Sequence, residues 1–126
     1  MILNERALTD KLLAGSKKLS KIVGSTLGPF GHTVIIRNKN QKPFVTKDGV
    51  TVANHVSLDD PFEQLAVDIV RQAAQSTVLA TGDGTTTSTV IACSLFEQFQ
   101  RIATLGIAPM QTKRSLDKFV AMVVEH

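Results

Sequence analysis

Three glycine-punctuated loops interrupt the apolar helical pattern of this chain, and each of them carries threonine or aspartate. They cover residues 26–31, 46–49 and 82–87. Elsewhere, apolar residues recur at the three- and four-residue spacing of amphipathic helices. Because Gly and Pro mark the ends of elements, the pattern predicts a mostly α fold with the three loops at one end of a helical bundle.

The apolar spacing predicts four long helices, one short helix and one small β-hairpin. The first long helix is expected over residues 5–25, before Gly28-Pro29. Residues 33–36 and 44–46 are expected to pair as short strands around the polar loop 38–42, and residues 50–56 to form the short helix. Pro61 opens the second long helix, the third follows the threonine triplet, and the fourth runs from about Pro109. The stripe expected to be buried on the second long helix is Leu65, Ala66, Ile69, Val70, Ala73 and Thr77.

The loop at residues 82–87, which reads Gly-Asp-Gly-Thr-Thr-Thr, has the composition of a phosphate-binding segment. It leads into a helix, whose first turn has unpaired amides and the positive end of the helix dipole. The glycines permit close approach of the backbone, and the threonine hydroxyls can donate to phosphate oxygens. Asp83 beside such donors suits a bridging Mg²⁺. There is no Gly-Lys-Ser/Thr, so this is not a Walker loop. From these residues alone, an ordinary helix start capped by threonine stays an open alternative.

The other two loops have the same punctuation. Thr26-Leu27-Gly28-Pro29-Phe30-Gly31 ends the first helix, and its glycines permit a tight backbone path along which a ligand could lie. Thr46-Lys47-Asp48-Gly49 connects the hairpin to the short helix and places a charge pair beside a flexible glycine. Gly-Pro and Asp-Gly are also the commonest turn dipeptides, so each loop taken singly is typical of a plain turn.

Composition limits the class of protein. The 126 residues, of which 43% are apolar, suffice for one domain with a core. Glu5, Arg6 and Asp10 interrupt any secretory signal, and no apolar run approaches the ~20 residues of a membrane helix. The single cysteine, Cys93, lies within a helical apolar pattern, so we expect a small core residue rather than a nucleophile. A lone cysteine favours a reducing, cytoplasmic compartment.

The charges and histidines suggest neither nucleic acid nor zinc. Residues 1–42 hold eight Lys/Arg against two acids, and residues 43–126 hold six against nine. The lysines of the first helix lie opposite its leucines, as on an ordinary solvated face, and the chain has no Trp or Tyr for base stacking. His32, His55 and His126 have no zinc-ligand spacing. We therefore expect no nucleic-acid partner and no membrane partner.

Five motifs in register resemble the group I chaperonins, the GroEL family. They are Thr26-Leu27-Gly28-Pro29, Thr46-Lys47-Asp48-Gly49-Val50, Asp60-Pro61-Phe62-Glu63, Gly82-Asp83-Gly84-Thr85-Thr86-Thr87-Ser88-Thr89-Val90, and Pro109-Met110 with Lys113-Arg114 and Leu116-Asp117-Lys118. The similarity extends over nearly the whole chain. It implies an ATP-driven protein-folding machine of stacked rings, with residues 1–126 as the N-terminal portion of the equatorial nucleotide-binding domain.

The resemblance also implies roles for single residues. Asp48 orients the attacking water, Asp83 holds Mg²⁺, and Lys47 lies beside the nucleotide. The residues implied to wrap the nucleotide are Thr26, Leu27, Gly28 and Pro29, and those implied to receive its phosphates are Gly84, Thr85, Thr86 and Thr87. The implied cofactors are ATP and Mg²⁺, with K⁺ as a further cation. The implied partners are other chaperonin subunits in a homo-oligomeric ring.

Family members are much longer than this chain. We therefore expect the intermediate domain, the apical domain that holds clients and co-chaperonin, and the returning half of the equatorial domain to be absent. A second catalytic acid belongs to the absent part, so we expect the chain alone to hydrolyse ATP weakly or not at all. The alternative function is a truncated, non-enzymatic subunit that docks with a full-length chaperonin ring or modulates it.

Overall fold

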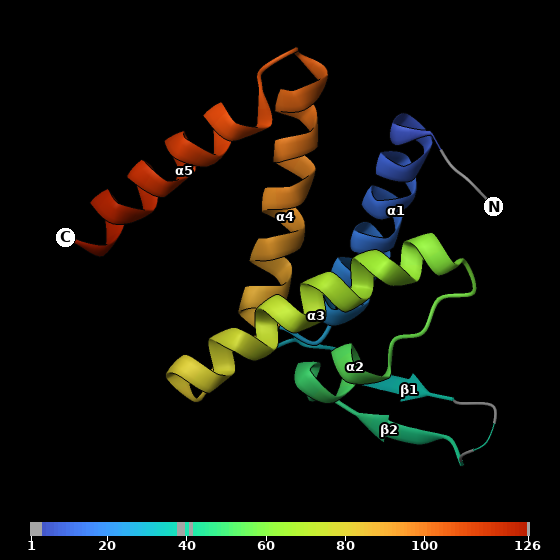
Figure 1. The fold of residues 1–126 in the computed structure, drawn as a ribbon. Helices are drawn as coiled ribbons and strands as arrows, with labels where there is room; N and C mark the ends of the chain where they lie inside the picture. Colours follow the sequence, from blue (N-terminus) through green and yellow to red (C-terminus); the bar gives the residue numbers. More distant parts are fainter. Residues whose placement is uncertain (1–3, 38–39, 41, 126) are drawn as a thin grey trace. The chain divides into compact units, whose positions relative to one another are not determined.

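The computed structural model describes residues 4–37, 40 and 42–125. These residues form a succession of helices interrupted by one antiparallel hairpin (Figure 1). The elements in chain order are α1 Glu5–Gly24, β1 Val34–Ile36, β2 Phe44–Thr46, α2 Gly49–His55, α3 Pro61–Thr81, α4 Thr85–Thr104 and α5 Pro109–Val124. The predicted mostly α fold with one small hairpin is confirmed. The polar hairpin loop expected at residues 38–42 lies partly outside the described residues.

The helices begin where the sequence provides capping side chains. Asn4 Oδ1 accepts a hydrogen bond from the Ala7 amide at 2.8 Å and starts α1. Asp60 Oδ1 accepts from the Phe62 amide at 2.9 Å, and Pro61 follows as the first residue of α3. These caps pair amides that the first helical turn leaves without carbonyl partners, which fixes both helix starts.

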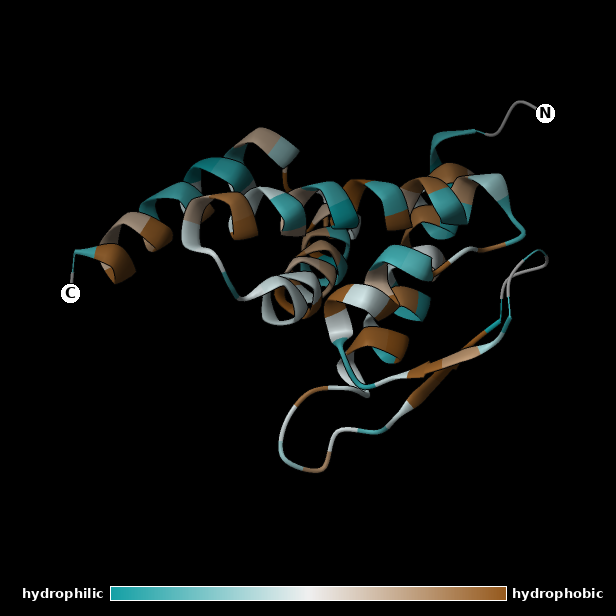
Figure 2. Cartoon of the chain, turned by 90° about the horizontal axis from the view of Figure 1, so that it is seen from below, coloured by the Kyte–Doolittle hydropathy of each residue, from teal (hydrophilic) through white to brown (hydrophobic). Residues whose placement is uncertain are grey.

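The chain divides into two compact units, Met1–Ser94 and Leu95–His126. The first unit holds α1, the hairpin, α2, α3 and the first half of α4. Strand β1 pairs with β2 from Val34 opposite Thr46 to Ile36 opposite Phe44, and both strands are largely apolar in Figure 2. The core of the unit takes side chains from every one of its elements except β2: Leu19, Val23, Ile36, Val52, Ala53, Val67, Val70 and Cys93.

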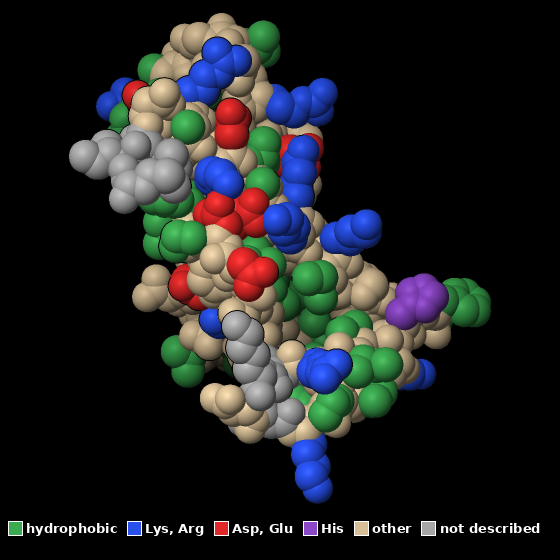
Figure 3. Space-filling model, turned by 90° about the vertical axis from the view of Figure 1, so that its right-hand side faces the viewer, with side chains coloured by type: hydrophobic (Ala, Val, Ile, Leu, Met, Phe, Trp, Pro, Cys, Tyr) green, Lys and Arg blue, Asp and Glu red, His purple; other side chains and the backbone are tan. Residues whose placement is uncertain are grey.

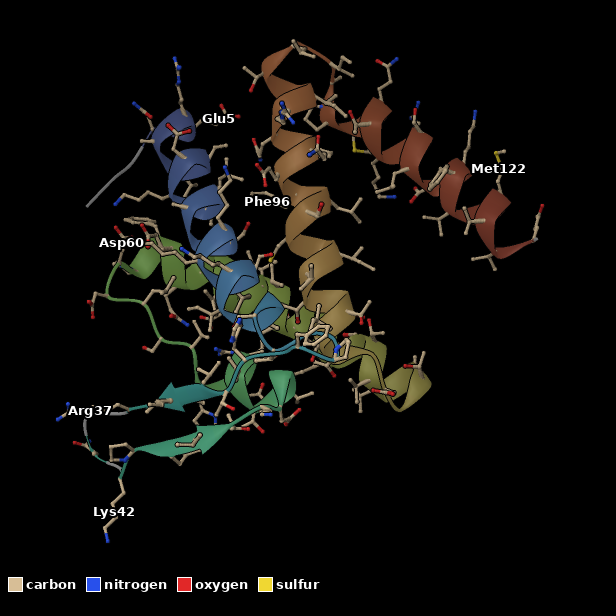
Figure 4. All side chains as sticks on the ribbon, turned by 180° about the vertical axis from the view of Figure 1, so that it is seen from behind. Glu5, Arg37, Lys42, Asp60, Phe96 and Met122 are labelled. Atoms are coloured by element: carbon tan, nitrogen blue, oxygen red, sulfur yellow. The ribbon has the colours of Figure 1, made fainter. Side chains whose placement is uncertain are left out.

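Helices α1 and α3 approach each other closely where α1 carries a glycine. A Cβ atom added to Gly15 would lie 2.3 Å from the carbonyl oxygen of Glu63, which is a backbone atom of α3. Two ion pairs flank this contact, from Lys11 to Asp60 and from Lys18 to Glu63. Figure 3 shows basic and acidic side chains side by side on this face, and Figure 4 labels Asp60 at the start of α3, beside α1.

We expect Gly15→Ala to destabilise the first unit by about 2–3 kcal/mol, because the new methyl group must push two helix backbones apart. The gain in helix propensity from Gly to Ala, about 1 kcal/mol, offsets only part of this cost. Gly24→Ala is the matched control, since a Cβ there would meet Val90 Cγ2 at an ordinary 3.7 Å. Denaturant unfolding measures both variants, and equal midpoints would contradict the close approach.

The Asp60 carboxylate should make stability depend on pH. Its pKa lies below the ordinary 3.8, chiefly because Lys11 donates a hydrogen bond to it, and the amides of Glu63 and Phe62 add to this effect. A carboxyl group with a lowered folded pKa stabilises the fold above its unfolded pKa and loses that effect as the pH falls through the folded value. Asparagine caps equally well but carries no charge. We therefore expect Asp60→Asn to melt below the wild type at pH 7 and the two melting temperatures to converge below about pH 4. A constant difference from pH 7 to pH 3 would contradict this.

The buried stripe of α3 differs from the predicted one. Leu65, Ile69 and Ala73 are exposed, and Thr77 is only half-buried. Ala66 and Val70 are buried as expected, together with Glu63, Val67 and Ala74. Because α3 contacts α1 at Gly15, Glu63 and the residues of α3 that follow it at intervals of one helical turn face α1. The most hydrophobic stripe is therefore not the one that packs.

The second unit consists of α4 from Leu95 onward, the turn at Gly106 and α5. Gly106 has φ +85°, a left-handed conformation that favours glycine. No residue of α5 within the described part of the chain is buried, and Phe119, Val120 and Val123 are each at least half exposed. Among the described residues, no helix combines the length and apolar character needed to cross a bilayer.

Candidate functional site

The loop at residues 82–84 joins α3 to α4 through two glycines in the left-handed region. Gly82 has φ +80° and ends α3, with its amide donating to the Val78 carbonyl, and Gly84 has φ +86°. Nothing lies within 4 Å of the position of a Cβ on either glycine. Their role in the fold is therefore the backbone conformation, which turns the chain directly into α4.

The threonine triplet is the first turn of α4, whereas the sequence predicted that the helix starts after it. The helix starts earlier because Gly84 completes the reversal, and threonine tolerates the first turn well. The amides of this turn have no carbonyl partners within the helix and form the positive end of its dipole. The three side chains differ in access: Thr85 is buried, Thr86 is half-buried and Thr87 is exposed. Thr86 and Thr87 are the better placed hydroxyl donors.

Asp83 lies directly before this turn and is exposed. Its Oδ1 accepts a hydrogen bond from the Gly84 amide at 2.6 Å, and its own carbonyl accepts from Thr81 Oγ1 at 2.8 Å. The carboxylate is therefore held at the mouth of the α4 N-terminus while it remains open to solvent. Such a hard, solvent-facing oxygen donor suits Mg²⁺.

The loop after α1 is a compact turn closed by backbone hydrogen bonds. The Gly31 amide donates to the Gly28 carbonyl at 3.0 Å, and the His32 amide donates to the Ser25 carbonyl at 2.7 Å. Gly28 has φ +82°, and a Cβ on Gly31 would lie only 2.3 Å from the Thr26 carbonyl oxygen. The predicted tight path at these two glycines is confirmed. Leu27, Gly28 and Pro29, which the resemblance places around a nucleotide, are all exposed.

Asp48 caps the short helix α2. Its carboxylate accepts from the Thr51 hydroxyl at 2.6 Å and from the amides of Val50 and Thr51 at 3.2 and 3.1 Å. The Thr51 hydroxyl is the largest cause that holds the pKa of Asp48 below its usual value; burial opposes it, and the two amides add to it. Asp48 is therefore an ionised, fixed carboxylate at neutral pH. Lys47 beside it is exposed.

Gly49 brings the three loops together. It is buried, and a Cβ added to it would lie 2.3 Å from Thr86 Oγ1 and 2.9 Å from Thr26 Oγ1. The start of α2 thus lies against both the first turn of α4 and the end of α1. The sequence suggested only a flexible glycine here, but the position requires one because side chains from two distant loops fill the space of a Cβ. The local sequence does not distinguish a glycine that is needed for flexibility from one that is needed because a Cβ would not fit.

Two hollows in the first unit lie away from this junction. One, of about 380 Å³, lies between the hairpin and α2 and includes Val34, Ile36 and Val56; the other, of about 330 Å³, lies along α3 at Leu65 and Ile69. Neither is lined by a residue of the three loops. The candidate site is thus a junction of loop ends at the surface, distinct from both hollows.

The burial of Cys93 and the spacing of the His, Asp and Glu side chains limit the reactions and metal ions that the described residues suit. Cys93 is buried in the core of the first unit, and burial raises the pKa of its thiol, as suits a small core residue. Within residues 4–37, 40 and 42–125, no group of three His, Cys, Asp or Glu side chains gathers at one place. A cation at Asp83 would therefore take most of its ligands from phosphate oxygens and water, as Mg²⁺ commonly does.

Two known chaperonins are similar to this chain over most of its length. A mitochondrial chaperonin CPN60 from Euglena gracilis is 44% identical over 115 residues, which are 91% of this chain and 20% of that protein. The solved chaperonin gp146 from the bacteriophage EL 2 (Pseudomonas aeruginosa), crystallised in the presence of ATP-BeFx, superimposes with a TM-score of 0.78 at 28% identity. That match covers 94% of this chain and 20% of the phage protein. The chain thus spans about one fifth of the length of both relatives.

The model of the TCP-1/cpn60 chaperonin family matches residues 19–126, a segment that contains all three loops. The resemblance drawn from the five sequence motifs is thereby confirmed. With most of its length matched, the chain belongs to the TCP-1/cpn60 chaperonin family.

Proposed function

We propose that the three loops form a MgATP site and that the chain is the ATP-binding and ATP-hydrolysing part of a ring chaperonin that assists protein folding. The observation that supports this most strongly is the contact of Gly49 with Thr86 and Thr26. This contact brings the first turn of α4, the N-cap residue Asp48 and the turn after α1 together on one surface. An ordinary capped helix start would not require the other two loops beside it.

The first turn of α4 would receive the phosphates. Its unpaired amides and positive dipole favour anions, and Thr86 and Thr87 add hydroxyl donors. Asp83 would hold Mg²⁺, which, when bound, offsets the negative charge of the phosphates. Exposed Lys47 supplies a further positive charge from the α2 side of the junction.

The turn at residues 26–29 would lie along the nucleotide. Its left-handed glycine and closed backbone leave Leu27 and Pro29 exposed as an apolar surface. The Thr26 hydroxyl donates to the Val23 carbonyl at 2.7 Å, which fixes this residue at the end of α1. A rigid turn suits nucleotide binding because little conformational freedom is lost when the ligand arrives.

Asp48 would orient the attacking water. A carboxylate with a lowered pKa is a weak base, but it accepts a hydrogen bond from water at all neutral pH values. Its position at the α2 N-terminus is fixed by three hydrogen bonds, so water bound to it would be positioned as well. Turnover would also use groups from the rest of a full-length chaperonin.

The relatives support the wider setting of this proposal. Both matched proteins are chaperonins, and one was crystallised in the presence of ATP-BeFx. We infer homo-oligomeric chaperonin subunits as partners, with clients and co-chaperonin bound by other domains. A cytoplasmic location is proposed from the lone cysteine and not from the relatives, one of which is mitochondrial. K⁺ is proposed as an additional cation from the family resemblance of the sequence motifs.

Titration calorimetry with the 126-residue chain tests the site. Heat should be released with MgATP, and binding should be lost when EDTA removes the cation. Phosphate release by the protein at its full encoded length tests turnover. MgATP binding that is equally strong with EDTA would contradict the proposed cation site. A lack of MgATP binding by both the 126-residue chain and the protein at its full encoded length would contradict the whole proposal.

The exposed apolar side chains favour a second candidate, a non-enzymatic subunit that docks with a chaperonin ring. Phe119, Val120 and Val123 on α5 are exposed, as are Leu65 and Ile69 on α3. Exposed apolar patches usually drive association. Among the residues that the structure describes, the hairpin adds strand edges with no further strand beside them.

We therefore expect the isolated chain to self-associate or to bind a full-length chaperonin. Light scattering after size exclusion should give a mass above the 13.6 kDa of one chain. Phe119→Asp should lower that mass if α5 carries the contact, while Glu125→Asp at the exposed end of α5 serves as control. A monomer at all concentrations, with no chaperonin bound, would contradict the docking function and leave the ATPase proposal intact.

A further inference from the structure

Arg71 on α3 connects three separate groups through one guanidinium. Its Nε donates to the Ala53 carbonyl at 3.1 Å and its Nη2 to the Val56 carbonyl at 2.9 Å, while Nη1 pairs with Asp68 at 3.2 Å. The Arg71 side chain is only 22% exposed, so its two bonds to carbonyls are partly shielded from water, whereas its pair with Asp68 is exposed. Each of the three guanidinium nitrogens thus donates one hydrogen bond.

The two carbonyls belong to the C-terminal end of α2. The last carbonyls of a helix have no intrahelical partners and carry the negative end of the dipole, which a cation stabilises. Helix α2 has only seven residues, too few to be stable without tertiary contacts. In Figure 1 it lies between the hairpin and α3, and Arg71 is the described side chain of α3 that bonds to its end.

A second set of bonds fixes Arg71 and the chain beyond α2. Asp68 accepts from Gln64 Nε2 at 2.8 Å as well as from Arg71. Gln64 Oε1 in turn accepts from the Leu58 amide at 2.8 Å. One side of α3 thus holds both the end of α2 and the segment that follows it.

The opposite end of α2 carries Asp48 and Gly49. Asp48 is the N-cap of the helix, and Gly49 contacts Thr86 with no space for a Cβ. A short helix held at one end by the α4 turn and at the other by Arg71 can neither slide nor tilt freely. Loss of the Arg71 bonds would release the far end and let the Asp48 carboxylate move.

We propose that Arg71 is a positioning residue for Asp48, acting through α2, an inference that rests on the proposed role of Asp48 in ATP hydrolysis. Arg71 does not lie in any of the three loops, so it should not contribute to nucleotide affinity. Its effect should appear in turnover and in the rigidity of α2. Lysine cannot replace it fully, because one ammonium group lacks the planar fork that reaches two carbonyls and a carboxylate.

The test compares Arg71→Met, which keeps the aliphatic length, with Gln72→Met, a change at the neighbouring exposed position. In the protein at its full encoded length, Arg71→Met should hydrolyse ATP about tenfold more slowly with a Kd for MgATP within about threefold of wild type. Peptides covering residues 49–56 should exchange amide hydrogen about tenfold faster by mass spectrometry. Arg71→Lys should fall between the two, and Gln72→Met should match the wild type.

A double variant distinguishes positioning from general support of the fold. With Asp48 already replaced by alanine, adding Arg71→Met should slow hydrolysis no further. A further tenfold loss in the double variant, or a parallel loss of MgATP affinity in Arg71→Met, would overturn the inference. If Asp48→Ala is slow but Arg71→Met resembles Gln72→Met in rate and exchange, only the inference fails. If Asp48→Ala hydrolyses ATP at the wild-type rate, the proposed role of Asp48 fails and the inference with it.

Discussion

Asp48→Ala should lower the rate of ATP hydrolysis about 100-fold in the full-length protein while MgATP still binds. The carboxylate is ionised and held by the Thr51 hydroxyl and two amides, so it offers water a fixed acceptor. Alanine removes that acceptor without touching the α4 turn. Steady-state phosphate release gives the rate, and calorimetry gives the affinity.

Asp48→Asn is the control that separates charge from structure. Asparagine caps a helix about as well as aspartate, so α2 should keep its place. We expect Asp48→Asn to retain the stability that Asp48→Ala loses, about 1 kcal/mol, yet to remain slow in hydrolysis. Wild-type turnover in both variants would return Asp48 to the role of an ordinary helix cap.

Asp83→Ala should abolish the Mg²⁺-dependent part of ATP binding. The carboxylate is exposed at the start of α4, and no cluster of other His, Cys, Asp or Glu ligands surrounds it in the described part of the chain. Asp83 is the one acidic residue of the loop at residues 82–87, so the variant loses the carboxylate that this loop offers to a cation. Calorimetry should therefore show the same weak heat for the variant with MgATP as for the wild type with ATP and EDTA.

Asp10→Ala is a suitable control for Asp83→Ala, because Asp10 is an exposed acid on α1, outside the three loops. It removes one negative charge without changing the candidate site. An Asp83→Ala variant that binds MgATP as tightly as Asp10→Ala would rule out Asp83 as the cation ligand.

Local signals predicted the element order well. Asp60-Pro61 marked the start of α3, Gly28-Pro29 the stop after α1, and the apolar segments around residues 38–42 the hairpin. Each of these signals acts within a few residues: a cap, a ring that fixes φ, or a loop that reverses the chain. Their effect does not depend on what the element later packs against, which is why they can be found in one sequence.

The packing faces could not be predicted in the same way. Leu65 and Ile69 are more hydrophobic than Glu63 and Ala74, yet the latter pair is buried. The choice depends on Gly15, which lets α1 approach α3 at Glu63, and on the ion pair from Lys18 that makes burial of Glu63 acceptable. Contacts between residues far apart in sequence leave no local pattern.

The candidate site shows the same division. The three loops were found from their glycines, threonines and acids, and the resemblance assigned their roles. Gly49 as a close contact and Arg71 as a connection to α2 were missed, because each depends on groups fifteen or more residues away. The one hint that the sequence offers is that Arg71, beside the buried stripe, is the single basic residue of α3.

The central claim is that three loops form one MgATP site, and amide chemical shifts measured during a titration test it most directly. On adding MgATP to the chain, the amides of Thr26, Gly49, Gly84, Thr86 and Thr87 should shift together along one binding curve. The shifts should disappear with EDTA or in Asp83→Ala. Shifts confined to residues 84–87, or curves with different midpoints for the three loops, would contradict a shared site.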